Sequence, residues 1–275
     1  MPYSLLGRNV LITGGSRGLG ALVAQKFAAE GSNIAINYMS NKETANKVAS
    51  DIANKYNVKT VVIQGDAGNK DACANTVKSA IEQLGGLDVV VSNAIVADNS
   101  SKGWTKMTNF ADLDAMDDAD WDKCWNINVK SSFHLFKAAL PTFNANPEGG
   151  AFIITSSTAG VTAAGSSLPY AVTKAARMWN NIIMPNISLI QSTVIHLMKC
   201  LASSQGEKIR VNAVLPGLLL TEWGQQFSPE KIDAWKGKTA LQRLPEVEDT
   251  ADMYVTIAKN NSMTGQAVRM GMSPQ

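Results

Sequence analysis

The feature that most constrains this chain is a short apolar run that passes directly into a glycine-rich turn. Residues 9–13 (NVLIT) have the pattern of a buried strand, residues 14–20 (GGSRGLG) follow at once, and a helical pattern covers residues 21–30. The glycines let backbone N–H groups approach a pyrophosphate, and the start of the helix adds a partial positive charge. This order predicts a dinucleotide-binding unit, and an ordinary glycine-rich turn is the alternative.

Strand-like and helical patterns alternate along the rest of the chain, without internal repeats or low-complexity segments. The order predicts a single α/β domain over residues 1–275. Strands are expected at residues 33–38, 60–64, 87–94, 151–155, 209–215 and 264–272. Helices are expected at residues 42–55, 70–84 and, as one long helix, 120–140.

Composition excludes several classes of function. A net charge of +2 without a long basic run gives no reason to expect nucleic acid or a membrane surface as a partner. The three cysteines are far apart and lack C-x-x-C spacing, which favours free thiols in a reducing compartment. No signal sequence precedes the first strand pattern, so a cytoplasmic location is expected. Only two histidines occur, which excludes a multi-histidine metal centre, and no metal is expected.

The end of the second predicted strand bears on the choice of dinucleotide. An enzyme that grips the ribose hydroxyls of NAD carries an acidic residue there, whereas this chain has Asn37, Tyr38 and Ser40. Arg17 lies inside the glycine turn, and a guanidinium beside a neutral strand end suits a 2′-phosphate. The pattern favours NADP over NAD, which stays an alternative, as does an Arg17 that only faces solvent.

Tyr170 and Lys174 are four residues apart, which places them one turn apart on one helix face. A neighbouring ammonium favours the ionised phenol, so the pKa of Tyr170 is expected to be lowered. A tyrosine tuned in this way can exchange a proton with an alcohol near neutral pH. Two solvated residues on a helix surface are the alternative.

Together these motifs resemble the short-chain dehydrogenase/reductase family. Its T-G-x-x-x-G-x-G cofactor loop matches residues 13–20, its P-G-x-x-x-T segment matches residues 216–221, and its serine stands thirteen residues before the tyrosine, as Ser157 does here. The resemblance implies an α/β Rossmann-type fold, a doubly wound parallel sheet with helices on both faces. It also implies NADP-dependent hydride transfer between a carbonyl and an alcohol.

The resemblance assigns roles to four residues. Ser157 would hydrogen-bond the substrate oxygen, and Tyr170 would give or take its proton. Lys174 would lower the pKa of Tyr170 and bind the nicotinamide ribose, and Asn128 would order a water of the proton relay. Ser156 is the alternative to Ser157, and a surface position is the alternative for Asn128.

The resemblance also implies the cofactor contacts. Asp66 corresponds to the family position beside the adenine ring, although a helix cap would explain it as well. Residues 218–220 with Trp223 and Phe227 would form either a lid over an apolar substrate pocket or part of the core. Family members commonly form homodimers or homotetramers that act on small molecules, and this is expected here. The implied cofactor-binding residues are Gly14, Ser16, Arg17, Gly18, Leu19, Gly20, Asn37, Tyr38, Ser40, Asp66, Ala67, Asn93, Ala94, Tyr170, Lys174, Pro216, Gly217 and Thr221.

Two segments depart from the family pattern. Removing residues 95–102 restores a continuous N-A-G motif, and removing residues 177–193 restores a continuous catalytic helix. The second insertion contains Pro185, and a fully helical insertion would turn the following apolar face by roughly 260°. It is therefore expected to loop out or to split the helix. The insertions motivate an alternative function, a catalytically impaired binding or scaffold protein. A Ser157-centred hydrolase is a weaker alternative, because no G-x-S-x-G elbow surrounds that serine.

Overall fold

A seven-stranded parallel sheet forms the centre of the molecule, in the order β3-β2-β1-β4-β5-β6-β7. The computed structural model describes residues 3–95, 111–161, 165–174 and 193–271. The doubly wound fold expected from the sequence is confirmed. Its strands are β1 (Asn9–Ile12), β2 (Asn33–Tyr38), β3 (Thr60–Gln64), β4 (Val89–Ser92), β5 (Gly150–Thr155), β6 (Ile209–Pro216) and β7 (Ala267–Met270).

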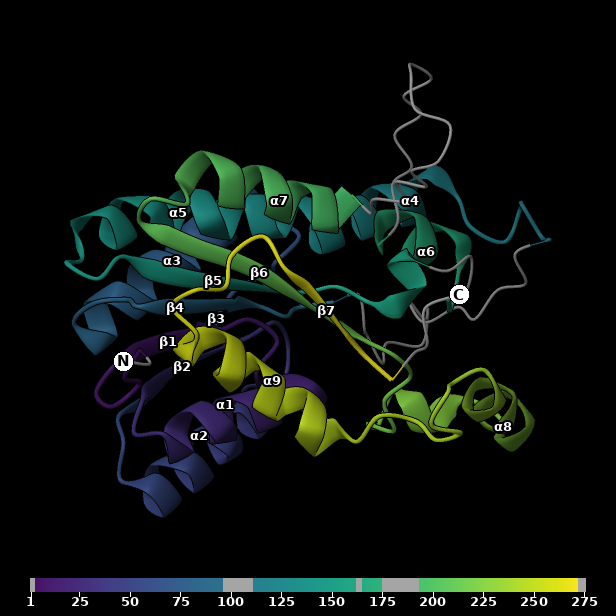
Figure 1. Cartoon of the computed structure of the whole chain (residues 1–275), viewed down its shortest axis with the longest axis horizontal. Coiled ribbons are helices and arrows are strands. Elements are labelled where there is room, and N and C mark those ends of the chain that lie inside the picture. The colour runs from purple at the N-terminus through teal and green to yellow at the C-terminus, as the bar shows by residue number, and fades with distance from the viewer. Residues whose placement is uncertain (1–2, 96–110, 162–164, 175–192, 272–275) are drawn as a thin grey trace.

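Helices cover both faces of the sheet and make three layers (Figure 1). One face carries α1 (Gly18–Ala29), α2 (Lys42–Tyr56) and α9 (Val247–Lys259). The other carries α3 (Lys70–Leu84), α5 (Ser131–Ala145) and α7 (Thr193–Gln205). Three shorter helices, α4 (Asp118–Trp125), α6 (Leu168–Lys174) and α8 (Pro229–Gly237), gather near one end of the sheet, on the right of Figure 1. Within the described ranges no helix is both long and apolar enough to cross a membrane.

The central strands read as continuous apolar runs because they are buried on both faces. Every residue of β4 and β5 is buried, and alternate side chains enter the two cores on opposite sides of the sheet. Phe152 packs edge to face on Phe136 of α5 with ring centroids 5.2 Å apart, while its neighbour Ile153 enters the opposite core. This packing fixes which face each strand residue meets.

Polar residues set the ends of the helices that lead into the sheet. The side chains of Asn41 and Asn69 accept hydrogen bonds from backbone N–H groups at the starts of α2 and α3. Asn57 and Gly85, both in the left-handed conformation, end the same two helices. These caps explain why the predicted bounds of both helices fall within one residue of those observed.

The long helix expected at residues 120–140 is interrupted, and that prediction is corrected. The helix α4 runs into a π-helical turn, η1 (Asn126–Lys130), before α5 begins. The N–H of Ser131 donates to the carbonyl of Asn126, five residues earlier, so the turn holds one residue more than an α-helical turn. Such turns are common at functional sites, and this one contains Asn128.

The two expected insertions fall mostly outside the described residues. Of residues 95–102 only Ile95 is described, and of residues 177–193 only Thr193, where α7 begins. Val194 and Met198 of α7 are completely buried against the sheet. The apolar face of α7 therefore points toward the core.

Candidate active site

The candidate site lies at the carboxyl ends of the strands, where β1 and β4 lead to opposite halves of the sheet. The glycine turn follows β1 and packs directly on the residues after β4. A Cβ atom at Gly20 would lie 2.4 Å from the Gly14 carbonyl oxygen and 2.5 Å from Nδ2 of Asn93. Gly14 itself has a φ of +63°. Only glycine fits at Gly20, which keeps the turn tight against the strand ends.

Thr13 ties the two strand ends together. Its hydroxyl accepts hydrogen bonds of 2.9 Å from the backbone N–H groups of Asn93 and Ala94. The Asn93 side chain returns a bond of 3.0 Å to the Thr13 carbonyl oxygen. Asn93 and Ala94 thus stand beside the glycine turn, and their contact with a cofactor stays a prediction. The part played by Thr13 was missing from the predicted site.

The polar residues after β2 differ in what they can reach. Asn37 is buried, and its side chain accepts from Gly14 N–H and donates to the Ile63 and Gly65 carbonyls. Tyr38 is buried in the core. Asn37 therefore holds the glycine turn through buried hydrogen bonds. Of these three residues, only Ser40 is exposed to solvent.

Arg17 and Asp66 are exposed, and they follow the carboxyl ends of β1 and β3, so both lie at the same edge of the sheet. An Asp66 carboxylate oxygen accepts a hydrogen bond of 2.8 Å from the N–H of Gly68, which turns the chain toward α3. The cap of α3 is Asn69 and not Asp66, so the helix-cap explanation of Asp66 is wrong, and its place beside an adenine ring stays a prediction. Thr221 lies over the glycine turn, because a Cβ atom at Gly18 would be 3.6 Å from its side chain.

Tyr170 and Lys174 occupy one short helix, α6, and Ser157 meets them from the end of β5. The Ser157 hydroxyl lies near enough to the Tyr170 hydroxyl to act on its pKa. The Nζ atom of Lys174 lies 5.8 Å from the centroid of the Tyr170 ring and donates a bond of 3.0 Å to the Thr155 carbonyl. Lys174 is 1% exposed, so the alternative of two solvated surface residues is wrong.

Burial dominates the electrostatics of this pair. Desolvation raises the pKa of Tyr170, and the nearby Ser157 hydroxyl acts in the opposite direction. Desolvation also lowers the pKa of Lys174 to about 8. The lowered tyrosine pKa expected from the spacing of the two residues is therefore not found in this structure.

Asn128 lies in the π-helical turn η1 and contacts α6, the helix that carries Tyr170 and Lys174. It is 3% exposed, and its Nδ2 atom donates a bond of 2.9 Å to the Thr173 hydroxyl of α6. Its Oδ1 atom is buried and has no hydrogen-bond partner among the described residues. A surface position for Asn128 is therefore wrong, and the free oxygen is an acceptor held beside the Tyr170 helix.

The two adjacent serines have different surroundings. Ser156 is 3% exposed, its N–H continues the ladder to Val214, and its hydroxyl has no partner among the described residues. Ser157 is only partly buried, and its hydroxyl accepts from the N–H of Ala159 and lies near the Tyr170 hydroxyl. Of the two serines, Ser157 is thus the one that solvent reaches, and its role stays a prediction.

The segment after β6 closes the site. The Pro216 carbonyl lies 3.5 Å from the Ser157 hydroxyl, and Gly217 N–H donates to Met270 of β7. The residues that follow are divided between core and surface. Leu218 and Leu219 are buried, whereas Leu220 is 42% exposed.

Comparison with known proteins identifies the class. Residues 8–179 match the family model described as short chain dehydrogenase, and residues 184–271 match one described as Enoyl-(Acyl carrier protein) reductase. The chain belongs to the short-chain dehydrogenase/reductase family, whose members are oxidoreductases.

Three relatives cover nearly all of the chain. It is 32% identical to the oxidoreductase YhxD of Bacillus subtilis, over 94% of this chain and 78% of the relative. It is 29% identical to the 3-oxoacyl-(acyl-carrier-protein) reductase FabG of Staphylococcus aureus, over 96% of both chains. A short-chain dehydrogenase of Burkholderia cenocepacia, solved in complex with NADP, superposes with a TM-score of 0.80 at 27% identity, over 98% of both chains.

Proposed function

We propose that this chain is an NADP-dependent oxidoreductase that interconverts a small carbonyl compound and an alcohol, with Ser157, Tyr170, Lys174 and Asn128 as its proton relay. One observation carries the proposal: the four residues come from three separate segments and lie together at α6. The Ser157 hydroxyl lies near the tyrosine hydroxyl, Lys174 lies 5.8 Å from the tyrosine ring, and Asn128 is hydrogen-bonded to Thr173 of the same helix. Membership of the family supports carbonyl–alcohol chemistry.

The glycine turn fits a dinucleotide. The absent side chain of Gly20 lets the turn lie against Asn93, and the start of α1 follows at once. The NADP complex of the Burkholderia relative and the lack of an acidic residue at the end of β2 support NADP. NADPH, when bound, supplies the hydride. The turn and the residues after β4 and β6 would hold it, with Arg17 and Ser40 near the 2′-phosphate.

Each relay residue has a separate task in reduction. Tyr170 gives its hydroxyl proton to the oxygen of the carbonyl compound as the alcohol forms. Ser157 donates a hydrogen bond to the same oxygen and so stabilises its developing negative charge. Lys174, when charged, favours the tyrosinate that is left, and the free Oδ1 atom of Asn128 accepts a bond from the water that returns a proton.

The test compares turnover with binding. NADPH and NADH consumption is followed with aldehydes, cyclic ketones and quinones, for the wild type and for Tyr170→Phe. The variant should bind NADPH with unchanged affinity and lose at least about 100-fold in kcat, because it lacks the transferable proton. A wild-type protein that binds NADPH but reduces no carbonyl compound would establish the scaffold alternative.

Assembly is a separate part of the proposal. The helices that carry Asn128 and Lys174 commonly form the interfaces in this family, so we infer a homodimer or homotetramer. Light scattering coupled to size exclusion gives the mass in solution. A 29.4 kDa particle at assay concentrations would contradict the proposed oligomer.

A further inference from the structure

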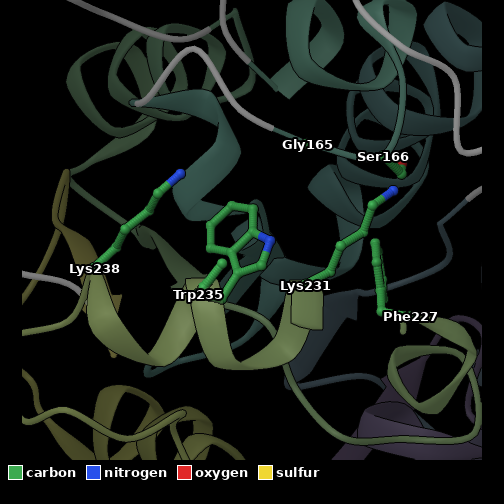
Figure 2. A pocket seen from close by; sticks show the side chains of 7 residues that line it. Gly165, Ser166, Phe227, Lys231, Trp235 and Lys238 are labelled. Carbon is green, nitrogen blue, oxygen red and sulfur yellow. The ribbon is translucent and has the colours of Figure 1, made fainter. Parts of the chain in front are cut away.

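A cavity of about 240 Å³ lies between α8 and the segment just before α6 (Figure 2). Its volume is just below the ~300–1,000 Å³ typical of sites for drug-sized ligands, which suits a small compound. The lining residues are Gly165, Ser166, Phe227, Lys231, Ala234, Trp235 and Lys238.

One wall of this cavity is in contact with the catalytic tyrosine. A Cβ atom at Gly165 would lie 3.3 Å from Cδ1 of the Tyr170 ring and 3.4 Å from Cβ of Ala171. Ser166, the next residue in the wall, is 9% exposed. The cavity wall at Gly165 therefore packs on the ring of Tyr170, the proposed proton donor to the substrate.

The opposite wall is cationic and aromatic. Lys231, Trp235 and Lys238 are spaced by four and three residues, so they share one face of α8 and its end. Figure 2 shows the two lysine side chains extending from α8 on either side of the Trp235 indole, with the ammonium group of Lys231 next to Ser166. The ammonium group of Lys238 lies 5.6 Å from the Trp235 ring. Phe227 adds a second ring.

The acidic residues of α8 are engaged elsewhere. Asp233 is 2.9 Å from Lys236, and the Glu230 carboxylate is hydrogen-bonded to Ser228. Among the described residues, neither Lys231 nor Lys238 forms a salt bridge, and no acidic side chain lines the cavity. Two like charges on one face with aromatic rings beside them are arranged for an anion with a flat or apolar body.

We propose that the substrate is a small carbonyl compound with an anionic group, and that Lys231 and Lys238 bind this group while Trp235 and Phe227 contact its apolar body. The inference rests on the proposed function and adds the class of substrate to it. The reaction is unchanged: NADPH, when bound, would supply the hydride for the new C–H bond, and Tyr170 supplies the proton of the alcohol. The inference adds only a charge interaction between these lysines and an anionic group of the substrate that is distant from the reacting carbon.

The experiment uses 4-formylbenzoate and its methyl ester, which share a ring and an aldehyde and differ in charge. The wild type should show kcat/KM about tenfold higher for the acid, mainly through a lower KM, since two exposed ion pairs supply the difference. The ratio should fall when salt is raised from about 20 mM to about 500 mM, because salt screens exposed charges.

The double variant Lys231→Gln/Lys238→Gln tests the assignment, and Lys236→Gln is its matched control. Lys236 is on the same helix and carries the same charge but is paired with Asp233. The acid-to-ester ratio should fall close to one in the double variant and stay at the wild-type value in the control. An equal kcat/KM for acid and ester in the wild type, or a preference that survives in the double variant, overturns the inference.

Failure of the proposed function is distinguishable from failure of this inference. If no carbonyl compound is reduced at all, the proposed function fails. Calorimetric titration with 4-(hydroxymethyl)benzoate then decides the inference alone. Binding by the wild type that the double variant loses supports an anion site, and the absence of binding to the wild type overturns it.

Discussion

The Nζ atom of Lys174 donates a hydrogen bond to the carbonyl oxygen of Thr155, so the last residue of β5 holds the lysine of α6. The Thr155 hydroxyl is in turn 2.8 Å from the Tyr254 hydroxyl of α9 and 3.3 Å from Oδ1 of Asn93. Thr155 thus links α6 to α9, on the opposite face of the sheet, and to Asn93, which follows β4 beside the glycine turn. This connection generates the first prediction.

Tyr254→Phe removes one partner of Thr155 and keeps the ring. We expect the free energy of unfolding to fall by about 1 kcal/mol, because a buried hydrogen bond is lost while Asn93 still pairs with the threonine. We also expect a higher KM for NADPH. Urea unfolding and initial rates measure the two effects. Tyr56→Phe in α2 is the control, since its hydroxyl has no hydrogen-bond partner among the described residues; a similar loss there would contradict the prediction.

Lys174→Met tests two effects of the buried ammonium group: its contribution to activity and its effect on the free energy of unfolding. Activity should fall at least about 100-fold. Burial lowers the pKa of Lys174 to about 8, below its ordinary value of about 10.5. Between these two pH values the unfolded chain binds more protons at this lysine than the folded chain does. The free energy of unfolding of the wild type, relative to the variant, should therefore rise as pH increases from about 8 to about 10.5. A difference that stays flat or falls over this range, in urea unfolding, would count against a buried Lys174.

The raised pKa of Tyr170 predicts an asymmetry between the two directions of reaction. The phenol stays protonated at neutral pH, so reduction has its proton donor there and keeps its rate into alkaline pH. Alcohol oxidation needs the tyrosinate and should become faster as pH rises. The measurement is kcat/KM in both directions from about pH 6 to about pH 10. An oxidation rate independent of pH would show that the tyrosine is not the base.

Gly20→Ala introduces a Cβ atom at 2.4 Å from the Gly14 carbonyl oxygen. Backbone must move to admit it, which we expect to cost about 1–3 kcal/mol of unfolding free energy and most of the NADPH affinity. Gly237→Ala in α8 is the matched control, because nothing lies within 4 Å of its added atom. Thermal unfolding and fluorescence titration with NADPH give the comparison, and equal behaviour of the two variants would refute the tight turn.

The three cysteines should differ in reactivity. Cys73 and Cys124 are buried, and desolvation raises the pKa of each thiol to about 11, whereas Cys200 is exposed. Iodoacetamide at pH 8 should label one thiol rapidly in the native protein and three in urea, as counted by intact mass. Rapid labelling of two or three thiols in the native state would contradict the burial of Cys73 and Cys124.

The sheet was predictable because its strands are buried on both faces. Residues 33–38 and 60–64 were predicted as strands, and β2 and β3 have those bounds. The interruption by η1 was not predictable, since one extra residue in a turn leaves the apolar pattern around Asn128 almost unchanged.

In the candidate site too, features set by neighbouring residues were predictable, and features set by contacts between distant segments were not. The spacing of Tyr170 and Lys174 predicted that they share a helix face, and they do. The direction of the tyrosine pKa depends on burial by segments far apart in the chain, which local spacing cannot report. The structural part played by Asn37 depends likewise on contacts with β3 and the glycine turn.

The helix α8 has no buried residue, although it supplies three of the side chains that line the cavity beside Tyr170 and a fourth, Lys238, follows at its end. Its sequence is therefore under little constraint from folding. Substitutions on its cavity face can change which compounds are accepted while the melting temperature stays nearly constant. Under the proposed role of α8, substrate choice and fold stability depend on separate residues, so substitutions can alter the first without lowering the second.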